Sequence, residues 1–261
     1  MKDIYYESSK DTSSALFAQT QKEFNGRLHF HRAFELAYIL SGNADYVVED
    51  ERFVAFENSI VFCHCYYRHK SYDNLPHKKH VIAVPENLTS DISAKFKEFT
   101  LPSLLVDTEF NKTILPYFNL LTQSSTNISS MVMKGYANII FGLLAEHYES
   151  VSIKSRNKNI AVIADILSYI DANFREPLTL DSLASVFGYN KTYFSRIFNR
   201  HIGMSLNNYL NMVRLTAFEE KIKQSDSKSV ADIAFECGFT SLATFYRVQK
   251  FRSLHKKIKE V

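Results

Sequence analysis

Apolar residues in the last hundred positions of the chain recur at the three- and four-residue spacing of amphipathic helices. The stretch 179–203 predicts two such helices, whose inward faces carry Leu180, Leu183, Ala184 and Phe187, then Tyr193, Phe194, Ile197 and Phe198. Thr179 and Asn190 are expected to cap these helices, because their side-chain oxygens can accept hydrogen bonds from the first turn. Gly188 is expected to end the first helix in a left-handed conformation. Two short helices around a glycine turn predict a helix-turn-helix.

The outward face of the second helix is basic and carries no acid. It presents Lys191, Thr192, Ser195, Arg196, Asn199 and Arg200. A cationic, hydrogen-bonding face of this kind is typical of a helix that reads DNA. An ordinary helical hairpin with a solvated basic face would show the same pattern, so the choice depends on whether the pattern recurs.

The pattern does recur, about fifty residues further on, which favours the DNA-reading interpretation. Ile233, Ala234, Gly238, Phe239, Phe245 and Arg247 repeat the positions of Leu183, Ala184, Gly188, Tyr189, Phe194 and Arg196. Between the two copies the spacing predicts one helix over 205–224, with a length of about 30 Å at 1.5 Å per residue. Successive major-groove segments on one face of DNA are roughly 34 Å apart. We therefore predict two reading helices held on a rigid spacer.

This part of the chain resembles the DNA-binding domain of the AraC/XylS transcription regulators. The resemblance is carried by residues 177–184 (PLTLDSLA), residues 193–205 (YFSRIFNRHIGMS), Arg214 and residues 233–239 (IAFECGF). It implies an all-α domain over 160–261, in which a long helix joins two helix-turn-helix units, and double-stranded DNA as the partner. It also implies contact with the transcription machinery if the protein is an activator.

The resemblance further implies which side chains reach DNA. In the first reading helix, Thr192, Ser195 and Arg196 are expected at base edges, and Lys191, Asn199 and Arg200 nearer the phosphates. In the second, the base-facing positions are Leu242, Ala243, Tyr246 and Arg247, with Thr244 and Lys250 toward the backbone. Of these side chains only the two arginines offer bidentate contact to guanine. We therefore predict a target of A·T-rich character.

The chain departs from the family pattern in its second copy. Gln249 stands where the first copy has Phe198, and a basic tail, residues 255–259 (HKKIK), follows. We expect the closing helix of the family to be absent or altered there. Phe218 stands where the family prefers a small residue, which implies local repacking.

The first hundred residues show a different pattern, made of short β-branched and aromatic runs. These predict strands at 34–40, 45–49, 52–56, 59–63 and 80–85, with breaks at 41–43 and 57–58. Short strands with no helices between them favour an antiparallel barrel or jelly roll, extending to about residue 105.

From about residue 110 to residue 150 the period becomes helical. Pro116 lies near the start of a first predicted helix, and a second begins at Ser130. The second is apolar on nearly all sides, so we expect it to be covered on more than one side. One side can pack on the barrel. The other could contact a second copy of the chain in a homodimer, or be buried within its own domain.

Histidines and a glutamate gather near the first predicted strand. His29, His31, Glu35 and Gly42 match the cupin pattern H-x-H-x3-E-x6-G, and His69 falls near the histidine of the second cupin motif. Alternation along a strand places His29 and His31 on one face, pointing into the barrel. The resemblance implies a cupin-like domain that holds a small-molecule effector. The residues expected to bind it are His29, His31, Glu35, Tyr38 and His69.

Metal ligation is the alternative for the same residues, because three histidines and a glutamate can hold a divalent ion. The chain would then be a metal sensor or a metalloenzyme with a DNA-binding domain. The second cupin motif lacks its usual glycine and proline, since Glu57, Asn58 and Cys65 stand there. We therefore expect no metal, no cofactor and no catalysis.

The stretch 63–80 is also rich in cysteine and histidine, so a zinc or redox sensor is conceivable. Cys63 and Cys65 would place both thiols on one face of a strand, without the C-x2-C turn of closed zinc sites. We favour the interpretation of a half-exposed strand and a polar loop.

Length and charge fit two domains with different partners. The chain has 261 residues and a formal net charge of +3, but residues 1–150 hold 14 Lys and Arg against 18 Asp and Glu, whereas residues 151–261 hold 17 against 10. A basic C-terminal half favours a polyanionic partner. No apolar run reaches membrane-spanning length and the start lacks a signal peptide, so we expect a cytoplasmic protein.

The predicted fold class is therefore a two-domain α+β protein. Residues 1–150 are expected to form the cupin-like antiparallel β-barrel, to about residue 105, with trailing helices over 110–150. Residues 151–159 are expected to form a linker, because they lack apolar periodicity. Residues 160–261 are expected to form the all-α domain.

Overall fold

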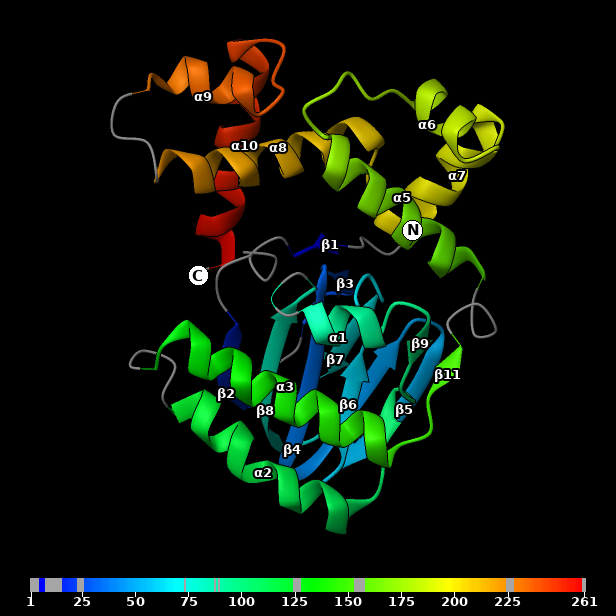
Figure 1. The fold of residues 1–261 in the computed structure, drawn as a ribbon, viewed down its shortest axis with the longest axis vertical. Coiled ribbons are helices and arrows are strands. Elements are labelled where there is room, and N and C mark those ends of the chain that lie inside the picture. The colour runs from blue at the N-terminus through cyan, green and yellow to red at the C-terminus, as the bar shows by residue number, and fades with distance from the viewer. Residues whose placement is uncertain are drawn as a thin grey trace. The chain divides into compact units, whose positions relative to one another are not determined.

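The computed structural model divides the chain into two compact units, Met1–Ala161 and Val162–Val261 (Figure 1). The structure describes residues 5–7, 16–22, 26–72, 74–86, 88, 90–123, 128–152, 158–223 and 228–259. Most of the predicted linker, residues 153–157, lies outside the described residues. None of the helices in the described part of the chain is both long and apolar enough to cross a bilayer.

The first unit is built on an antiparallel sheet, apart from one parallel pair formed by its two shortest N-terminal strands. Its members among the described residues are β1 (Tyr5–Tyr6), β2 (Phe17–Lys22), β3 (His29–Phe30), β4 (Ala33–Val48), β5 (Glu51–Phe56), β6 (Ile60–Cys63), β7 (His69–Tyr72), β8 (His77–Pro85) and β10 (Leu104–Leu105). A separate small pair joins β9 (Phe99–Thr100) and β11 (Val151–Ser152). Hydrogen bonding between the described strands does not connect the edge strands of this sheet to each other. Closure into a barrel therefore stays a prediction.

Strand β4 organises this sheet. Its first part, Ala33–Ile39, pairs with β6 and β8, and its last part, Asn43–Val48, pairs with β5 and β7. The sequence predicted a break at 41–43, and this prediction is wrong, because the strand continues through a register shift. Gly42 makes the bend possible: its φ is +74°, and a Cβ there would collide with the carbonyl of Pro76.

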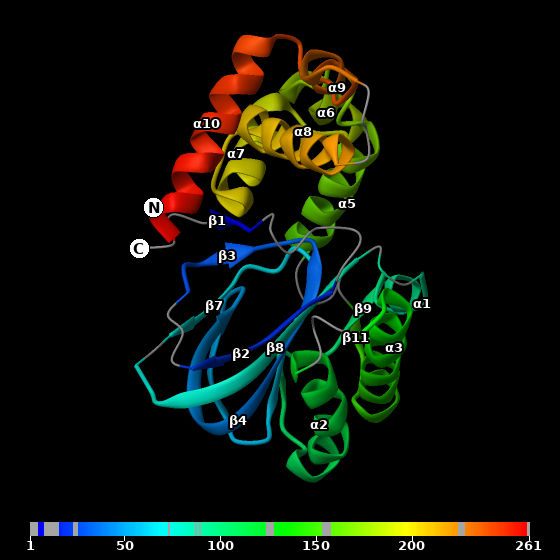
Figure 2. The same ribbon diagram turned by 90° about the vertical axis from the view of Figure 1, so that its left-hand side faces the viewer.

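The two faces of β4 pack against different partners. Ala37, Ile39 and Tyr46 belong to a buried apolar cluster on the inner face. Phe34 and Tyr38 point to the other face, where their rings contact helices: Phe34 meets Phe141 and Tyr38 meets Phe118. The described helices of this unit are α1 (Ser90–Lys95), α2 (Thr108–Gln123) and α3 (Ser130–His147). Figure 2 shows α2 and α3 together on one side of the sheet.

In the described part of the chain, helix α3 is covered on one side only. Its buried residues are Ala137, Ile140, Phe141 and Leu144. On the other side Met131 is 82% exposed, Val132 43% and Ile139 40%. The alternative in which this helix is buried all round within its own domain is therefore wrong.

The second unit is all helical. Its helices are α5 (Lys158–Asn173), α6 (Leu180–Val186), α7 (Lys191–Ile202), α8 (Leu206–Ile222), α9 (Val230–Glu236) and α10 (Leu242–Lys259). The predicted spacer is continuous but shorter than expected: Ser205 caps α8, which spans about 25 Å at 1.5 Å per residue. Gln224, where the predicted spacer ended, lies outside the described residues.

The C-terminal helix is longer than the first reading helix. The expectation was a closing helix that is absent or altered, and the structure has one long helix in this place, because α10 continues through the basic tail to Lys259. Phe218 packs its ring 4.6 Å from that of Phe245, and both side chains are buried. The expected repacking around Phe218 is thus an aromatic contact between α8 and α10.

Candidate nucleic-acid interface and effector site

Local capping chemistry defines the first helix-turn-helix, α6 and α7. Thr179 and Ser182 form a reciprocal capping box at the start of α6. Asn190 accepts a hydrogen bond of 2.8 Å from the backbone N–H of Tyr193 and so begins α7. Gly188 lies between them with φ +71°. These features occupy the positions that the sequence predicted for them.

The second helix-turn-helix, α9 and α10, repeats this chemistry. Ser229 accepts a hydrogen bond from the N–H of Asp232, and Ser241 accepts one from the N–H of Thr244. Gly238 has φ +86°. The repeat seen in the sequence is therefore a repeat of caps and turn as well as of apolar positions.

The polar face of α7 is exposed within the second unit, so a binding partner could reach it. Phe194 and Phe198 are buried beneath it, and the exposed side chains are Lys191, Thr192, Arg196, Asn199 and Arg200, with Ser195 half-buried. The Arg196 guanidinium lies 5.7 Å from the ring centre of Tyr193, which orients it by a cation–π contact. Lys191 pairs with Asp181 of α6 at 2.7 Å.

The corresponding face of α10 is only partly available. Ala243, Tyr246, Arg247 and Lys250 are exposed. Leu242 packs instead against the apolar cluster around Phe239 and Phe245. The Thr244 hydroxyl lies 3.0 Å from that of Ser241, within the cap. Leu242 and Thr244 therefore contribute to packing and capping within the unit, and they are less exposed than the sequence suggested.

Helix α8 connects the two helix-turn-helix motifs of the second unit. Figure 1 shows α7 near one end of α8 and α10 near the other, and Figure 2, which looks along α8, draws both on the same side of it. At the α9 end, Lys221 and Lys228 each lie 2.5 Å from Glu236. Their positive charges and hydrogen bonds lower the pKa of that carboxyl to about 2.

Arg214 stabilises the domain from within. It is buried in α8, where Nε donates to the carbonyl of Phe174 at 2.8 Å and Nη2 to that of Glu176 at 2.9 Å. Burial lowers the pKa of the guanidinium from its usual range. Arg214 therefore holds the end of α5 against α8 and does not face outward with the reading helices.

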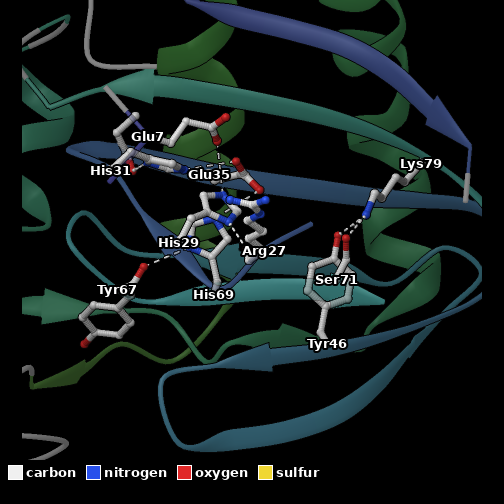
Figure 3. Close-up of polar contacts among 11 residues, drawn as sticks. Glu7, Arg27, His29, His31, Glu35, Tyr46, Tyr67, His69, Ser71 and Lys79 are labelled. Carbon is white, nitrogen blue, oxygen red and sulfur yellow. Dashed lines mark hydrogen bonds and ion pairs between the residues drawn. The ribbon is translucent and has the colours of Figure 1, made fainter. Parts of the chain in front are cut away.

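The first unit contains a buried cluster of four predicted effector residues, which we call the histidine cluster: His29, His31, Glu35 and His69. His29 and His69 face each other across the β3–β7 pair, and Glu35 comes from the part of β4 that pairs with β6 and β8. One ligand-type atom from each of the four lies within 4.8 Å of the others. Figure 3 shows the three imidazoles gathered around the Glu35 carboxylate.

Each imidazole of the cluster is oriented by a backbone carbonyl. Nδ1 of His29, His31 and His69 lies 2.9 Å from the carbonyl oxygens of Arg27, Ala33 and Tyr67 respectively. A carbonyl oxygen only accepts, so each Nδ1 carries a proton and each Nε2 is directed into the cluster. His31 Nε2 lies 3.2 Å from Glu35 Oε2, and His69 Nε2 lies 3.5 Å from Glu35 Oε1.

Tyr38, the fifth predicted effector residue, lies apart from the histidine cluster. It is three positions after Glu35 on β4 and so points to the opposite face. Its hydroxyl donates to Asn58 Oδ1 at 2.9 Å, and its ring contacts Phe118 of α2. Burial raises the pKa of Tyr38 to about 12. A ligand seated in the histidine cluster does not reach this side chain.

Residues 63–80 separate into different environments. Only His69 joins the histidine cluster, which is the one group of metal-type ligands found among the described residues. Cys63 and Cys65 are buried, and neither forms a disulfide with another described cysteine. His64 lies between the carbonyls of Phe96 and Cys65, and His80 bonds to Thr20 and Asn119. Burial lowers the pKa of both imidazoles.

Sequence reasoning missed a buried lysine beside this site. Lys79 is 1% exposed, and its ammonium donates to the Tyr46 hydroxyl at 2.9 Å and to Ser71 Oγ at 2.8 Å (Figure 3). Burial, and to a smaller extent the nearby Glu35 charge, raise the pKa of Tyr46. The alternation of faces along β8 could have identified it, because Lys79 occupies a position that points inward, whereas its neighbour Lys78 is exposed.

Comparison with known proteins bears on the second unit. A family model described as a helix-turn-helix domain matches residues 183–253. The Transposon Tn10 TetD protein of Escherichia coli is 33% identical over 96 residues, which cover 37% of this chain and 69% of TetD. The multiple antibiotic resistance protein MarA of Escherichia coli K12 is 32% identical over 95 residues, covering 36% of this chain and 74% of MarA.

These relatives and the geometry of the paired helices identify the class. The chain belongs to the AraC/XylS family of transcription regulators and is a DNA-binding regulator, not an enzyme.

One solved structure resembles more of the chain. It is wild-type ToxT of Vibrio cholerae with a bound unsaturated fatty acid, which is 13% identical and covers 90% of this chain and 89% of its own, with a TM-score of 0.48. Nothing about a ligand of the present chain follows from a similarity of that degree.

Proposed function

We propose that this protein is a sequence-specific transcription regulator whose N-terminal unit binds an effector at the histidine cluster and controls how a homodimer engages DNA. The regulator class is given by family membership; the sequence specificity, the effector and the dimer are the proposal. A regulator of this kind works where the DNA is, which we take to be the cytoplasm. Contact with the transcription machinery follows if it activates.

The observation that carries the DNA proposal is the pair of capped helices with an exposed arginine at the same position in each. Arg196 and Arg247 are both exposed on the outward faces of α7 and α10. Bidentate contact of arginine with guanine contributes about 1–3 kcal/mol. Binding of a selected duplex and of a random duplex, measured by fluorescence anisotropy at fixed salt, tests the proposal.

Arg196→Ala and Arg247→Ala should each weaken binding to the selected duplex by roughly 10- to 100-fold, while binding to random DNA changes less. Arg52→Ala is the control, because Arg52 is an exposed arginine of the first unit and its loss changes the net charge equally. Equal affinity of the wild-type protein for both duplexes would contradict sequence-specific reading.

The effector proposal is supported by the buried, polar and pre-oriented character of the histidine cluster. Coupling to DNA requires a ligand that prefers one arrangement of the protein over another. Anisotropy of wild type and of His69→Gln in the presence of cell extract small molecules, fractionated by mass, tests it. A fraction that shifts the DNA affinity of wild type but not of the variant supports an effector, whereas fractions that shift both alike contradict this site.

The homodimer proposal is supported by the uncovered apolar side of α3. Met131, Val132 and Ile139 lie exposed on it, and Leu120 of α2 is 41% exposed. Ile139→Glu should shift the protein to monomer in sedimentation velocity. Val106→Glu is the control, because Val106 is 55% exposed but lies on neither helix. A wild-type protein that sediments as monomer at all concentrations would overturn the dimer.

A further inference from the structure

We infer that Tyr193 is a positioning residue for DNA reading: its ring braces the guanidinium of Arg196 and makes the first helix-turn-helix the more selective of the two. The inference deepens the proposed function and rests on it, because it takes α7 and α10 as the helices that meet base edges. It assigns a share of the sequence specificity to an aromatic side chain that itself stays away from the bases.

The first argument is the geometry of the pair on α7. Tyr193 and Arg196 are three positions apart, so their side chains are neighbours on the helix surface. The Arg196 guanidinium lies 5.7 Å from the centre of the Tyr193 ring, within the range of a cation–π contact. Tyr193 is half-buried and Arg196 is exposed. The ring is therefore the more fixed member of the pair, and the guanidinium remains open to a partner.

The ring of Tyr193 is itself held by the turn. The ring centre of Tyr189 lies 5.3 Å from that of Tyr193, at the spacing typical of aromatic pairs. The backbone N–H of Tyr189 donates to the carbonyl of Ala184 at 2.8 Å, which fixes the turn against the end of α6. Contacts therefore continue from the end of α6 through two aromatic rings to the guanidinium of Arg196.

The contact leaves the hydrogen-bonding groups of Arg196 available. A guanidinium that stacks on a ring uses its face, and its N–H donors lie in its plane, where a base edge can meet them. Among the described residues no carboxylate pairs with Arg196, whereas Lys191 of the same helix pairs with Asp181 at 2.7 Å. A neutral ring thus orients Arg196 without occupying the donors that bidentate contact with guanine requires.

Orientation matters because arginine is a long side chain with many rotamers. Ordering such a side chain on binding has an entropic cost, and a side chain that is already held in place loses less. A braced guanidinium is also less able to move to another acceptor when guanine is replaced. Discrimination between bases should therefore rise together with affinity.

The second helix-turn-helix lacks this arrangement. Thr244 stands at the position of Tyr193, and its hydroxyl belongs to the cap of α10. Phe239, in the second turn, packs its buried ring 5.3 Å from that of Phe245. None of the cation–π contacts in the described part of the chain involves Arg247. We therefore expect the arginine of α10 to specify its base pair less strictly than that of α7.

The test is a double-mutant cycle on the full chain, with binding to the selected duplex measured by fluorescence anisotropy at fixed salt. Tyr193→Leu removes the ring and keeps an apolar side chain. It should weaken binding by about two- to fivefold, the size of an exposed cation–π contact. In the Arg196→Ala background the same substitution should have almost no effect. Tyr193→Phe, which keeps a ring, should recover most of the affinity.

Arg247 provides the matched control, because it is the exposed arginine of the other reading helix. In the Arg247→Ala background, Tyr193→Leu should still weaken binding by about two- to fivefold. Equal losses in the two alanine backgrounds would overturn the inference alone, as would the absence of any loss in the otherwise wild-type protein. Equal affinity of wild type for selected and random duplexes would overturn the proposed function, and this inference with it.

A second measurement does not depend on how much of a variant is folded. Single guanines of the selected duplex are replaced in turn by 7-deazaguanine, which lacks the N7 acceptor of the bidentate contact. The ratio of the affinities for the two duplexes cancels the active fraction of the protein. One replacement should weaken binding of wild type but not of Arg196→Ala, and at this guanine the ratio should be smaller in Tyr193→Leu than in wild type. An unchanged ratio would mean that Tyr193 only supports the fold and would overturn the inference, and so would the absence of such a guanine.

Discussion

Arg214 of α8 lies close enough to Gly238 of the second turn to leave no room for a side chain there. A Cβ added to Gly238 would lie 3.0 Å from Nε of Arg214, and 2.8 Å from the Cα of Arg175. Arg214 also donates to two carbonyls after α5. The end of α5, the spacer helix and the second helix-turn-helix therefore meet at one point in the all-helical unit.

Gly238→Ala should destabilise this unit more than Gly188→Ala. Both glycines have positive φ, so either alanine costs about 1–2 kcal/mol of backbone strain. Only residue 238 faces the backbone of Arg175, which adds roughly 1–3 kcal/mol for overpacking. Nothing lies within 4 Å of a Cβ at residue 188. Urea unfolding monitored by circular dichroism measures both, and equal losses would contradict the close contact.

Arg214→Met should lower the free energy of unfolding by about 2–4 kcal/mol, because it leaves the carbonyls of Phe174 and Glu176 without their donor. The methionine keeps part of the apolar stem, so the loss reports mainly on the guanidinium. Arg200→Met, at an exposed position of α7, should change the stability by no more than about 0.5 kcal/mol. Similar losses in both variants would contradict the buried role of Arg214.

The stability of the first unit should fall as the pH is lowered below about 6.5. Burial lowers the pKa of His64 in the folded state, whereas the unfolded chain has the ordinary value of about 6.5. The unfolded state then binds more protons, so this contribution is complete above pH 6.5 and is lost below it. Thermal unfolding from pH 7.5 to 5 should show a smaller loss in His64→Gln. Parallel curves for the two proteins would contradict the assignment.

DNA selected by the full chain from a random pool should be A·T-rich, with few strongly specified guanines. Arg196 and Arg247 alone among the predicted base-facing side chains offer bidentate contact to guanine. Ala243 is exposed and can touch a thymine methyl group, but cannot hydrogen-bond. High-throughput sequencing of the selected pool measures this preference. Half-sites that are rich in guanine throughout would contradict it.

The helical unit could be predicted closely because its signals are local. Caps at Thr179 and Asn190 and a turn at Gly188 are set by residues within a few positions, and the 3.6-residue period marks the buried face. The end of α10 was less predictable. The departure from the family pattern after Arg247 suggested a closing helix that is absent or altered, and it did not show that helix-forming residues extend α10 itself to Lys259.

The sheet was harder to predict, because a glycine between apolar runs fits either a turn or a bend within one strand. At Gly42 the choice depended on pairing with β8, whose partner residues lie more than thirty positions away. The placement of Tyr38 was predictable and was missed, since a separation of three positions on a strand reverses the face.

The membership of the histidine cluster was predicted for four residues, but its geometry was not. His29 and His69 come together only because β3 pairs with β7, a contact across forty residues of chain. The positions of the carbonyl oxygens that orient the imidazoles are set by the backbone conformation, which the residue types do not predict. Side-chain chemistry alone therefore named the candidates and left the orientation of their nitrogens open.

The alternation along strand β4 determines which face of the sheet each side chain after Glu35 occupies. Because Glu35 faces the sheet interior and Tyr38 faces α2, removal of one residue between them would bring both side chains to the same face. Either the carboxylate would then be pressed against an aromatic helix surface, or the phenol would enter the polar interior. Evolution of this segment should thus tolerate substitutions far better than insertions or deletions, so that the length of this short run is under stronger selection than its composition.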